Sequence, residues 1–231
     1  MRARVQSIQR QISENAKVAG RSPESIRLLA VSKTHDASKI REAYGLGLRD
    51  FGENYADELS TKAILLADLS DLRFVFIGQL QSNKIQAIVR HAHEIQSIAS
   101  EKHARYIERY AGEAGKSNYP VWIVLNAGNE ASKQGVTFET LAALAAFINE
   151  HCPHLSLQGV MAIPPSTFTD SGWKKSRDQS IPDIYNRLRL AANQTGLGKL
   201  SLGMSGDLAL AIAAGSDCVR IGTAIFGQRD A

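Results

Sequence analysis

The sequence contains little cysteine: Cys152 and Cys218 are the two among its 231 residues. Two cysteines so far apart do not form the disulfide framework of a small secreted domain. No apolar run is long enough to cross a bilayer. The first twenty residues place apolar side chains at helical spacing and lack the continuous apolar core of a secretory signal. We therefore expect a soluble protein of a reducing compartment, the cytoplasm.

The sequence also lacks a strong excess of charge of one sign. Lysine and arginine total 27 and aspartate and glutamate total 23, which gives a formal net charge of +4. No basic block is long enough to form a nucleic-acid-binding arm, so neither a nucleic acid nor a membrane is expected as a partner. The motifs of P-loop proteins, serine hydrolases and helical zinc proteases are absent, and the histidine pairs lack the spacing of a zinc site.

Eight short apolar segments alternate with segments of helical periodicity. The eight are residues 27–33, 48–52, 73–78, 94–98, 121–126, 157–163, 200–204 and 218–222. Alternating strands and helices are typical of a parallel sheet. Eight such units predict an α/β protein with a closed (β/α)8 barrel of the TIM type, formed by residues 1–231 as one domain with an extra N-terminal helix. An open doubly wound sheet is the alternative. Residues 164–180 lack a clear period, and we expect them to form a mobile loop.

In barrels of this kind the functional groups lie where the strands end. The first strand ends at Lys33, after an apolar run. Apolar surroundings disfavour an ammonium group and lower the pKa of its amine, and a neutral amine is the form that attacks an aldehyde to give a Schiff base. The alternative is a lysine that extends past the strand end into solvent. Barrel closure places strand eight beside strand one, so we expect Arg220 to lie close to Lys33.

Glycine and hydroxyl residues follow the last two predicted strands. Ser205 precedes a helical segment, and Gly222 and Thr223 follow strand eight. The loops after strands seven and eight form the recurrent phosphate site of this fold, because N–H groups at a helix N-terminus and hydroxyls attract an anion. Each feature alone is also explained as a helix cap or a turn. Together with the amine and the guanidinium, they favour a phosphorylated pyridine aldehyde as the ligand.

Five segments resemble the pyridoxal phosphate homeostasis family. They are LLAVSKTH (28–35), FGENYADE (51–58), IGQLQSNK (77–84), LSLGMSGD (200–207) and VRIGTAIFG (219–227), the last followed by Arg229. The resemblance implies a single barrel similar to the N-terminal domain of alanine racemase. It implies that pyridoxal 5′-phosphate (PLP) forms a Schiff base with Lys33 and that Arg220 faces the pyridine nitrogen. By the same resemblance, the phosphate is held by Ser205, Gly222 and Thr223, and Met204 and Asn54 line the cofactor.

The chain departs from the family pattern in two places. Phe74 and Val75 stand where the family often has Trp-His, which removes an imidazole from the barrel. Residues 164–180 replace a stretch that is more commonly acidic. The lysine, arginine and phosphate elements are unaffected.

A permanently charged arginine beside the ring nitrogen disfavours the protonated pyridine, so the cofactor is expected to stabilise carbanions weakly. Racemases of this type add a second base from a further domain, for which we expect no room after Ala231. We therefore expect a monomeric, non-catalytic protein that binds, buffers and delivers PLP, with PLP-dependent apoenzymes as recipients. Two alternatives stay open. One is a weak amino-acid racemase with Tyr44 or Tyr55 as second base; the other is a cofactor-free barrel enzyme acting on a phosphorylated metabolite.

Overall fold

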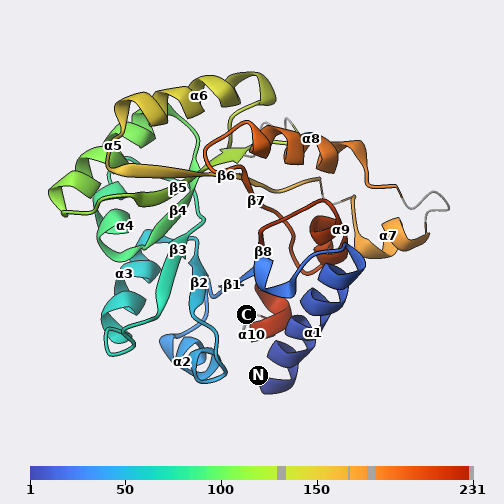
Figure 1. Cartoon of the computed structure of the whole chain (residues 1–231). Helices are drawn as coiled ribbons and strands as arrows, with labels where there is room; N and C mark the ends of the chain where they lie inside the picture. The colour runs from blue at the N-terminus through green and yellow to red at the C-terminus, as the bar shows by residue number, and fades with distance from the viewer. Residues whose placement is uncertain (129–133, 166, 176–179, 229–231) are drawn as a thin grey trace.

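Eight parallel strands close into one barrel with helices around it (Figure 1). A computed structural model describes residues 1–128, 134–165, 167–175 and 180–228. The strands follow one another around the barrel in chain order, and β8 pairs with β1. They are β1 (Arg27–Val31), β2 (Asp50–Glu53), β3 (Arg73–Phe76), β4 (Glu94–Ile98), β5 (Tyr119–Leu125), β6 (Leu155–Ala162), β7 (Lys199–Ser201) and β8 (Cys218–Ile221). The predicted barrel is confirmed, and the alternative of an open sheet is wrong.

Several strands end earlier than the apolar pattern predicts. β1 ends at Val31, β3 at Phe76 and β7 at Ser201, whereas the apolar segments continue for two or three residues more. The extra residues form loops at the C-terminal rim of the barrel, where they line a cavity or contact it. The difference places Lys33 and Met204 on loops beyond the strand ends.

Helices cover the outside of the barrel in the described part of the chain. They are α1 (Arg2–Val18), α2 (Ala37–Gly45), α3 (Ala56–Leu65), α4 (Ile85–His91), α5 (Glu101–Glu113), α6 (Phe138–His151), α7 (Asp170–Lys175), α8 (Asp183–Asn193), α9 (Leu208–Ala213) and α10 (Thr223–Phe226), with a 3-10 turn at Pro23–Ser25. Among these helices, none is both long and apolar enough to cross a membrane.

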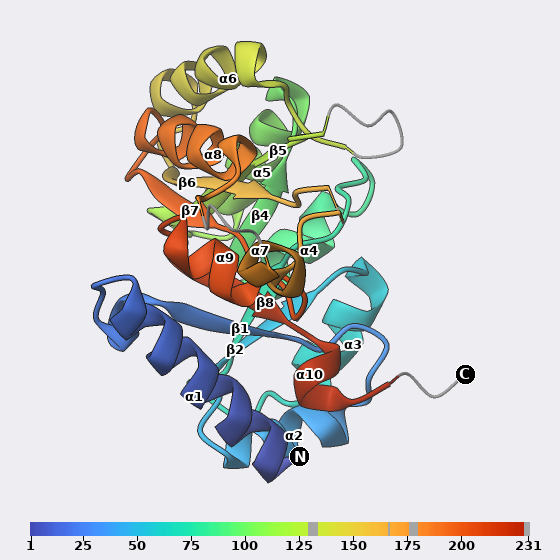
Figure 2. The same cartoon turned by 90° about the vertical axis from the view of Figure 1, so that its right-hand side faces the viewer.

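The extra N-terminal helix is present as α1. Its apolar side chains Val5, Ile8, Ile12 and Ala16 recur at helical spacing and are buried. They face the barrel side of the molecule, because α1 packs along α9 and α10 (Figure 2). The first and last helices of the described chain therefore lie side by side and cover the region where β8 meets β1.

Residues 164–180 contain a helix that the sequence pattern does not predict. This helix, α7, packs against α9. Its first residue fixes the contact: the Asp170 N–H donates to the Gly206 carbonyl O at 2.8 Å, and the Asp170 carboxylate accepts the N–H groups of Ala209 and Leu210, each at 2.9 Å. The expectation of an irregular loop is therefore wrong for the α7 part. Other parts of the segment lie outside the described residues.

A small apolar cluster lies inside the barrel. Leu29, Val75 and Cys218 form it, and Ile77 packs against it. Val75 occupies the place where the resembling family often has histidine, so an apolar contact replaces an imidazole there. Both cysteines of the chain, Cys152 and Cys218, are free and buried.

Candidate functional site

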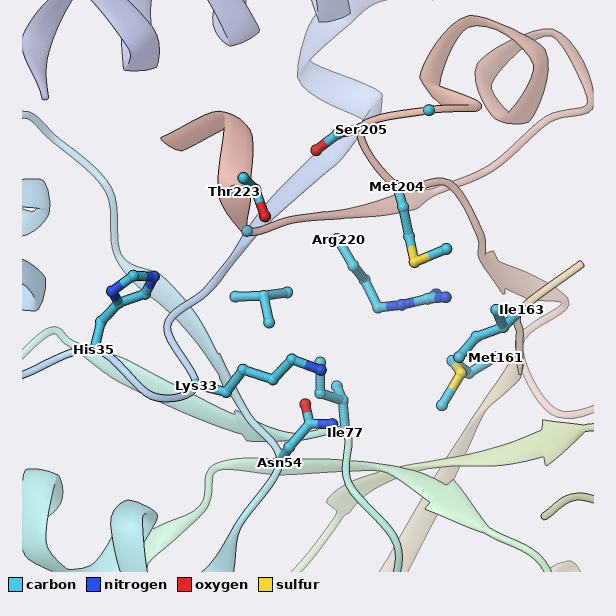
Figure 3. Close-up of a pocket in the computed structure, with 13 residues that line it drawn as sticks. Lys33, His35, Asn54, Ile77, Met161, Ile163, Met204, Ser205, Arg220 and Thr223 are labelled. Carbon is cyan, nitrogen blue, oxygen red and sulfur yellow. The ribbon is translucent and has the colours of Figure 1, made fainter. Parts of the chain in front are cut away.

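A cavity of about 350 Å³ opens at the C-terminal end of the barrel. All seven residues proposed from the sequence line it: Lys33, Asn54, Met204, Ser205, Arg220, Gly222 and Thr223. Figure 3 shows Lys33 and Arg220 pointing into the cavity, with Ser205 and Thr223 on one side and Asn54 on the other. The ends of β1, β2, β7 and β8 therefore bring these residues together.

Arg220 reaches the cavity from β8, next to β1. Leu29 of β1 is its register partner. The side chain is buried and donates to the Ser201 carbonyl O at 2.7 Å, to the Ser201 Oγ at 2.9 Å and to the Ala162 carbonyl O at 2.7 Å. Burial lowers the pKa of the guanidinium from its ordinary value, but a guanidinium in a protein remains charged. No described carboxylate forms a salt bridge with Arg220, although the Asp207 carboxylate attracts it electrostatically without direct contact. The guanidinium therefore has no ion-pair partner that a ligand would have to displace.

The turn between β7 and α9 places Ser205 and Gly206 at the edge of the cavity. Asp207, the next residue, is buried, and its carboxylate accepts the Met204 N–H at 2.7 Å and the Tyr185 hydroxyl at 2.9 Å. Burial raises the pKa of the Asp207 carboxyl, and these two hydrogen bonds oppose the rise. The bonds fix the turn from below, so Ser205 and Gly206 stay exposed above it.

The N-terminus of α9 differs from the sequence-based expectation. The N–H groups of Ala209 and Leu210 already donate to Asp170 of α7. These two groups are therefore not open to an anion, and the expected anion site at this helix N-terminus is wrong in that detail. What the turn offers to the cavity is the Ser205 hydroxyl and the backbone around Gly206.

The turn after β8 places Gly222 and Thr223 at the same side of the cavity as Ser205 (Figure 3). A Cβ atom on Gly222 would lie 3.2 Å from the Val31 carbonyl O, so any larger residue would push the end of β8 away from β1. Thr223 begins α10, and its side chain is exposed. The turns after β7 and β8 thus place the Ser205 and Thr223 hydroxyls on the same side of the cavity.

Asn54 lies just beyond β2, on the opposite side of the cavity. Its Oδ1 is buried and has no hydrogen-bond partner among the described residues. A buried acceptor without a partner costs free energy unless a ligand provides the donor. Gly78 allows the Asn54 backbone to approach closely, because a Cβ on Gly78 would lie 1.9 Å from the Asn54 carbonyl O.

Sequence reasoning missed some residues that line the cavity. His35 follows Lys33 by two residues, is buried, and stacks on Phe226 with ring centroids 5.1 Å apart. The other missed lining residues are Val31, Ile77, Met161 and Ile163. The motif LLAVSKTH contained the signal for His35, whereas the four apolar residues look like ordinary strand residues in the sequence.

The family model of the alanine racemase N-terminal domain matches residues 5–230. The pyridoxal phosphate homeostasis protein of Pseudomonas aeruginosa is 42% identical over 219 residues, which are 95% of this chain and 91% of that protein. The chain belongs to the pyridoxal phosphate homeostasis family.

Solved structures agree with membership of this family. PipY of Synechococcus elongatus, solved with PLP bound, is 35% identical, has a TM-score of 0.72 and matches 94% of this chain and 100% of its own. Alanine racemase of Corynebacterium glutamicum is 17% identical, with a TM-score of 0.60 over 94% of this chain and 60% of its own. The second likeness shows that the family member shares the fold of the racemase barrel.

The two tyrosines considered as a second base lie away from the cavity of this family member. The Tyr44 hydroxyl, on α2, hydrogen-bonds to Asp71. Tyr55 is the N-cap of α3 and is 53% exposed. Neither is among the described residues that line the cavity, so the structure does not place either tyrosine at the site.

Proposed function

We propose that this chain binds PLP in the cavity, holds it through a Schiff base on Lys33, and takes part in intracellular PLP homeostasis by buffering and delivering it. The observation that carries the proposal is the convergence in one cavity of a lysine, a buried arginine held by neutral oxygens, and two hydroxyl-bearing turns. The name of the Pseudomonas aeruginosa relative and the PLP bound to PipY support it.

The residues fit the charge and the shape of PLP. The positive charges of Lys33 and Arg220 favour entry of the anionic ligand into the cavity, and the hydroxyls of Ser205 and Thr223 donate hydrogen bonds to its phosphate. The Asn54 Oδ1 lacks a partner among the described residues and accepts a hydrogen bond from the ligand. When bound, PLP supplies an aldehyde carbon that an amine attacks.

Arg220 favours a carrier over a catalyst. We place its guanidinium at the pyridine nitrogen, where a group that is always charged disfavours a proton on the ring. A carboxylate at the same position would stabilise that proton and make the ring a strong electron sink. The chain therefore binds the cofactor in a form that stabilises carbanions weakly, as suits a protein without robust catalysis.

The phosphate side of the cavity is open, which suits reversible release. Met204 is 41% exposed, and Ser205 and Thr223 are exposed. PLP held there exchanges with solvent more readily than PLP enclosed in a core. We propose PLP-dependent apoenzymes as recipients, and a monomer in the cytoplasm as the acting form.

A weak amino-acid racemase is the second candidate. Racemisation needs a base on each face of the substrate, and Lys33 supplies one. His35 is the further titratable side chain in the described lining besides Arg220, and its stacking on Phe226 fixes its ring. If the protein is a racemase, it interconverts the two enantiomers of an amino acid, and His35→Gln abolishes that interconversion while Lys33 still exchanges the α-hydrogen of one enantiomer with deuterium in heavy water.

The first test is the visible absorption spectrum of the protein incubated with PLP, followed by borohydride reduction and peptide mapping. We expect a Schiff-base band that borohydride abolishes, and a reduced adduct on the peptide that contains Lys33. Lys33→Ala should lose both signals, and Lys84→Ala, at a surface lysine paired with Asp57, should keep both. An unlabelled wild-type protein would contradict both PLP hypotheses and favour the cofactor-free barrel enzyme.

A further inference from the structure

A buried ionic cluster lies beneath the segment that carries Lys33. Lys62 of α3 is buried, and its Nζ donates to Glu53 Oε1 and Glu58 Oε2 at 2.8 Å each and to the Ser32 carbonyl O at 2.9 Å. Glu53, the last residue of β2, is fully buried and also accepts the Ser32 hydroxyl at 2.6 Å. We call Glu53, Glu58 and Lys62 the support cluster.

The support cluster holds the peptide groups on both sides of Lys33. The Ser32 carbonyl belongs to the peptide bond before Lys33 and accepts from Lys62. The Thr34 N–H belongs to the peptide bond after Lys33 and donates to Glu58 Oε2 at 2.8 Å. The same Glu58 oxygen also accepts from Lys62, so one ammonium and one carboxylate join the two peptide groups. The Cα atom of Lys33 is therefore fixed from both sides.

Thr34 has a backbone conformation that requires this support. Its φ is +65°, in the left-handed region that is unfavourable for a β-branched residue. The conformation turns the chain directly after Lys33. As a result, the Lys33 side chain lines the inner cavity, whereas Thr34 lines an outer groove together with Glu58 and Lys62. The hydrogen bond from Thr34 to Glu58 stabilises the turn.

The composition of the support cluster indicates that it positions neighbouring groups more than it adds to the free energy of unfolding. Burial raises the pKa of the Glu53 carboxyl, although Lys62 and Ser32 oppose the rise. The Glu53 Oε2 has no hydrogen-bond partner in the part of the chain that the structure describes. Buried ion pairs of this kind add little net stability compared with apolar packing, but they fix the groups that they contact.

We propose, on the basis of the proposed function, that Lys62 and Glu58 are positioning residues for the covalent capture of PLP. They hold Lys33 so that its amine reaches the aldehyde carbon of PLP bound in the cavity. A displacement of about 1 Å in such a reacting group strongly reduces its reactivity. The support cluster acts through the backbone of Lys33 and touches no part of the ligand.

Capture is tested in Lys62→Met and Glu58→Gln, with Lys84→Met and Asp57→Asn as matched controls. The controls remove the same charges from the exposed pair between Asp57 of α3 and Lys84, the N-cap of α4. The dissociation constant of PLP, followed by absorbance, should rise about tenfold in Lys62→Met, as for other residues that orient a ligand-binding group. It should rise by a smaller factor in Glu58→Gln, which loses the charge that binds Lys62 but keeps an acceptor for Thr34. It should stay at the wild-type value in both controls.

A second measurement needs no PLP. An acylating reagent modifies the amine of Lys33 in the apo protein, and mass spectrometry gives the rate at that peptide as a function of pH. Loss of the Lys62 ammonium favours the charged form of Lys33, whereas loss of the Glu58 carboxylate disfavours it. The pH midpoints should therefore move in opposite directions. Arg220 and His35 line the same cavity as Lys33, Glu53 belongs to the support cluster, and all three are the same in both variants.

The outcomes separate this proposal from the function on which it rests. A wild type that takes up no PLP overturns the proposed function, and the apo measurement then decides the positioning role alone. Unchanged midpoints, or midpoints that move in the same direction, overturn the positioning role. If Lys62→Met unfolds because Glu53 loses its partner, Glu53→Gln combined with Lys62→Met removes both buried charges, and Glu58→Gln keeps an acceptor for Thr34. Wild-type capture in these folded variants also overturns the positioning role.

Discussion

Buried charged side chains have different kinds of partner at the two ends of the barrel. At the N-terminal end, Arg27, Asp50, Arg73 and Glu94 are the first residues of β1 to β4. Arg27 pairs with Asp50 and with Glu94 at 2.6 Å each, and Arg73 lies 3.6 Å from Asp50 and 3.8 Å from Glu94. At the C-terminal end, Arg220 is held by carbonyl and hydroxyl oxygens, and no described carboxylate pairs with it.

This difference separates a structural use of charge from a functional one. An arginine balanced by carboxylates has little attraction left for another anion, whereas an arginine held by neutral oxygens keeps its charge for a ligand. Hydrogen bonds connect the two ends: Arg220 donates to the Ser201 Oγ, Ser201 donates to Gln96 Oε1 at 2.8 Å, and Gln96 donates to Glu94 Oε1 at 2.7 Å. The neutral side chains of Ser201 and Gln96 thus separate Arg220 from the carboxylate of Glu94.

The largest effect is expected from breaking the N-terminal end. Glu94→Gln keeps the side-chain volume but removes the carboxylate from Arg27 and Arg73. The free energy of unfolding should fall by about 3 kcal/mol, because the buried Glu94 carboxylate is lost and Asp50 alone is left to balance Arg27, which is largely buried, and Arg73. Urea unfolding of the apo protein measures the change. Glu113→Gln, at the exposed pair with Arg109, should cost about 0.5 kcal/mol or less, and equal losses in the two variants would remove the distinction.

Arg220→Met should reduce the stability less than Glu94→Gln does, and should weaken PLP binding strongly. The free energy of unfolding should fall by about 1 to 2 kcal/mol, because methionine fills much of the volume but the Ser201 and Ala162 carbonyl oxygens lose a donor. The dissociation constant of PLP should rise about 10- to 100-fold with the loss of a charged hydrogen-bond donor. Absorbance titration measures it, and Arg41→Met, at an exposed pair with Asp68, should leave it unchanged. A large loss of stability with unchanged PLP affinity would place Arg220 with the structural arginines.

Thr223→Val sharpens the same contrast at the phosphate side. Valine keeps the shape of threonine but removes the hydroxyl, so PLP should bind about tenfold more weakly through one lost hydrogen bond to a charged group. Pyridoxal, which has no phosphate, should bind wild type and variant equally. Parallel titrations with the two ligands measure the difference. A similar loss for both ligands would show that Thr223 supports the cavity wall and not the phosphate.

Much of the fold and the site was predictable because the signals were local. Eight apolar runs predicted the barrel, and closure of the barrel brings Arg220 of β8 beside β1, so that Arg220 lines the same cavity as Lys33 on the loop after β1. Residues at the strand ends then converge on one rim whatever the details of packing. For the same reason all seven proposed residues line one cavity, although their contacts with PLP stay a prediction.

The rest depends on contacts between distant residues. Lys62 follows Glu58 by four positions, a spacing that by itself indicates an exposed helical ion pair, yet Lys62 is buried because Glu53 and Ser32 also bind it. At the N-terminus of α9, the Ala209 N–H donates to the carboxylate of Asp170, which lies 39 residues earlier in the chain. No local pattern predicts that contact. The sequence shows the charged residues that begin β1 to β4, but it does not show that they form ion pairs with one another. Those pairs depend on the alignment of neighbouring strands.

The smallest effect concerns Asp207, the buried carboxylate of the C-terminal end. Burial raises its pKa in the folded protein above the unfolded value of 3.8. The folded state therefore binds the proton more tightly, so the stability from this group is full below the unfolded pKa and is lost as the pH rises through the folded pKa. Asp207→Asn stays neutral, so its free energy of unfolding relative to wild type should rise with pH across this window. Urea unfolding between about pH 4 and pH 7 measures the difference. A difference that does not depend on pH would mean that the hydrogen bonds from Met204 and Tyr185 fully offset burial, and that this end of the barrel tolerates a buried carboxylate as well as the other end does.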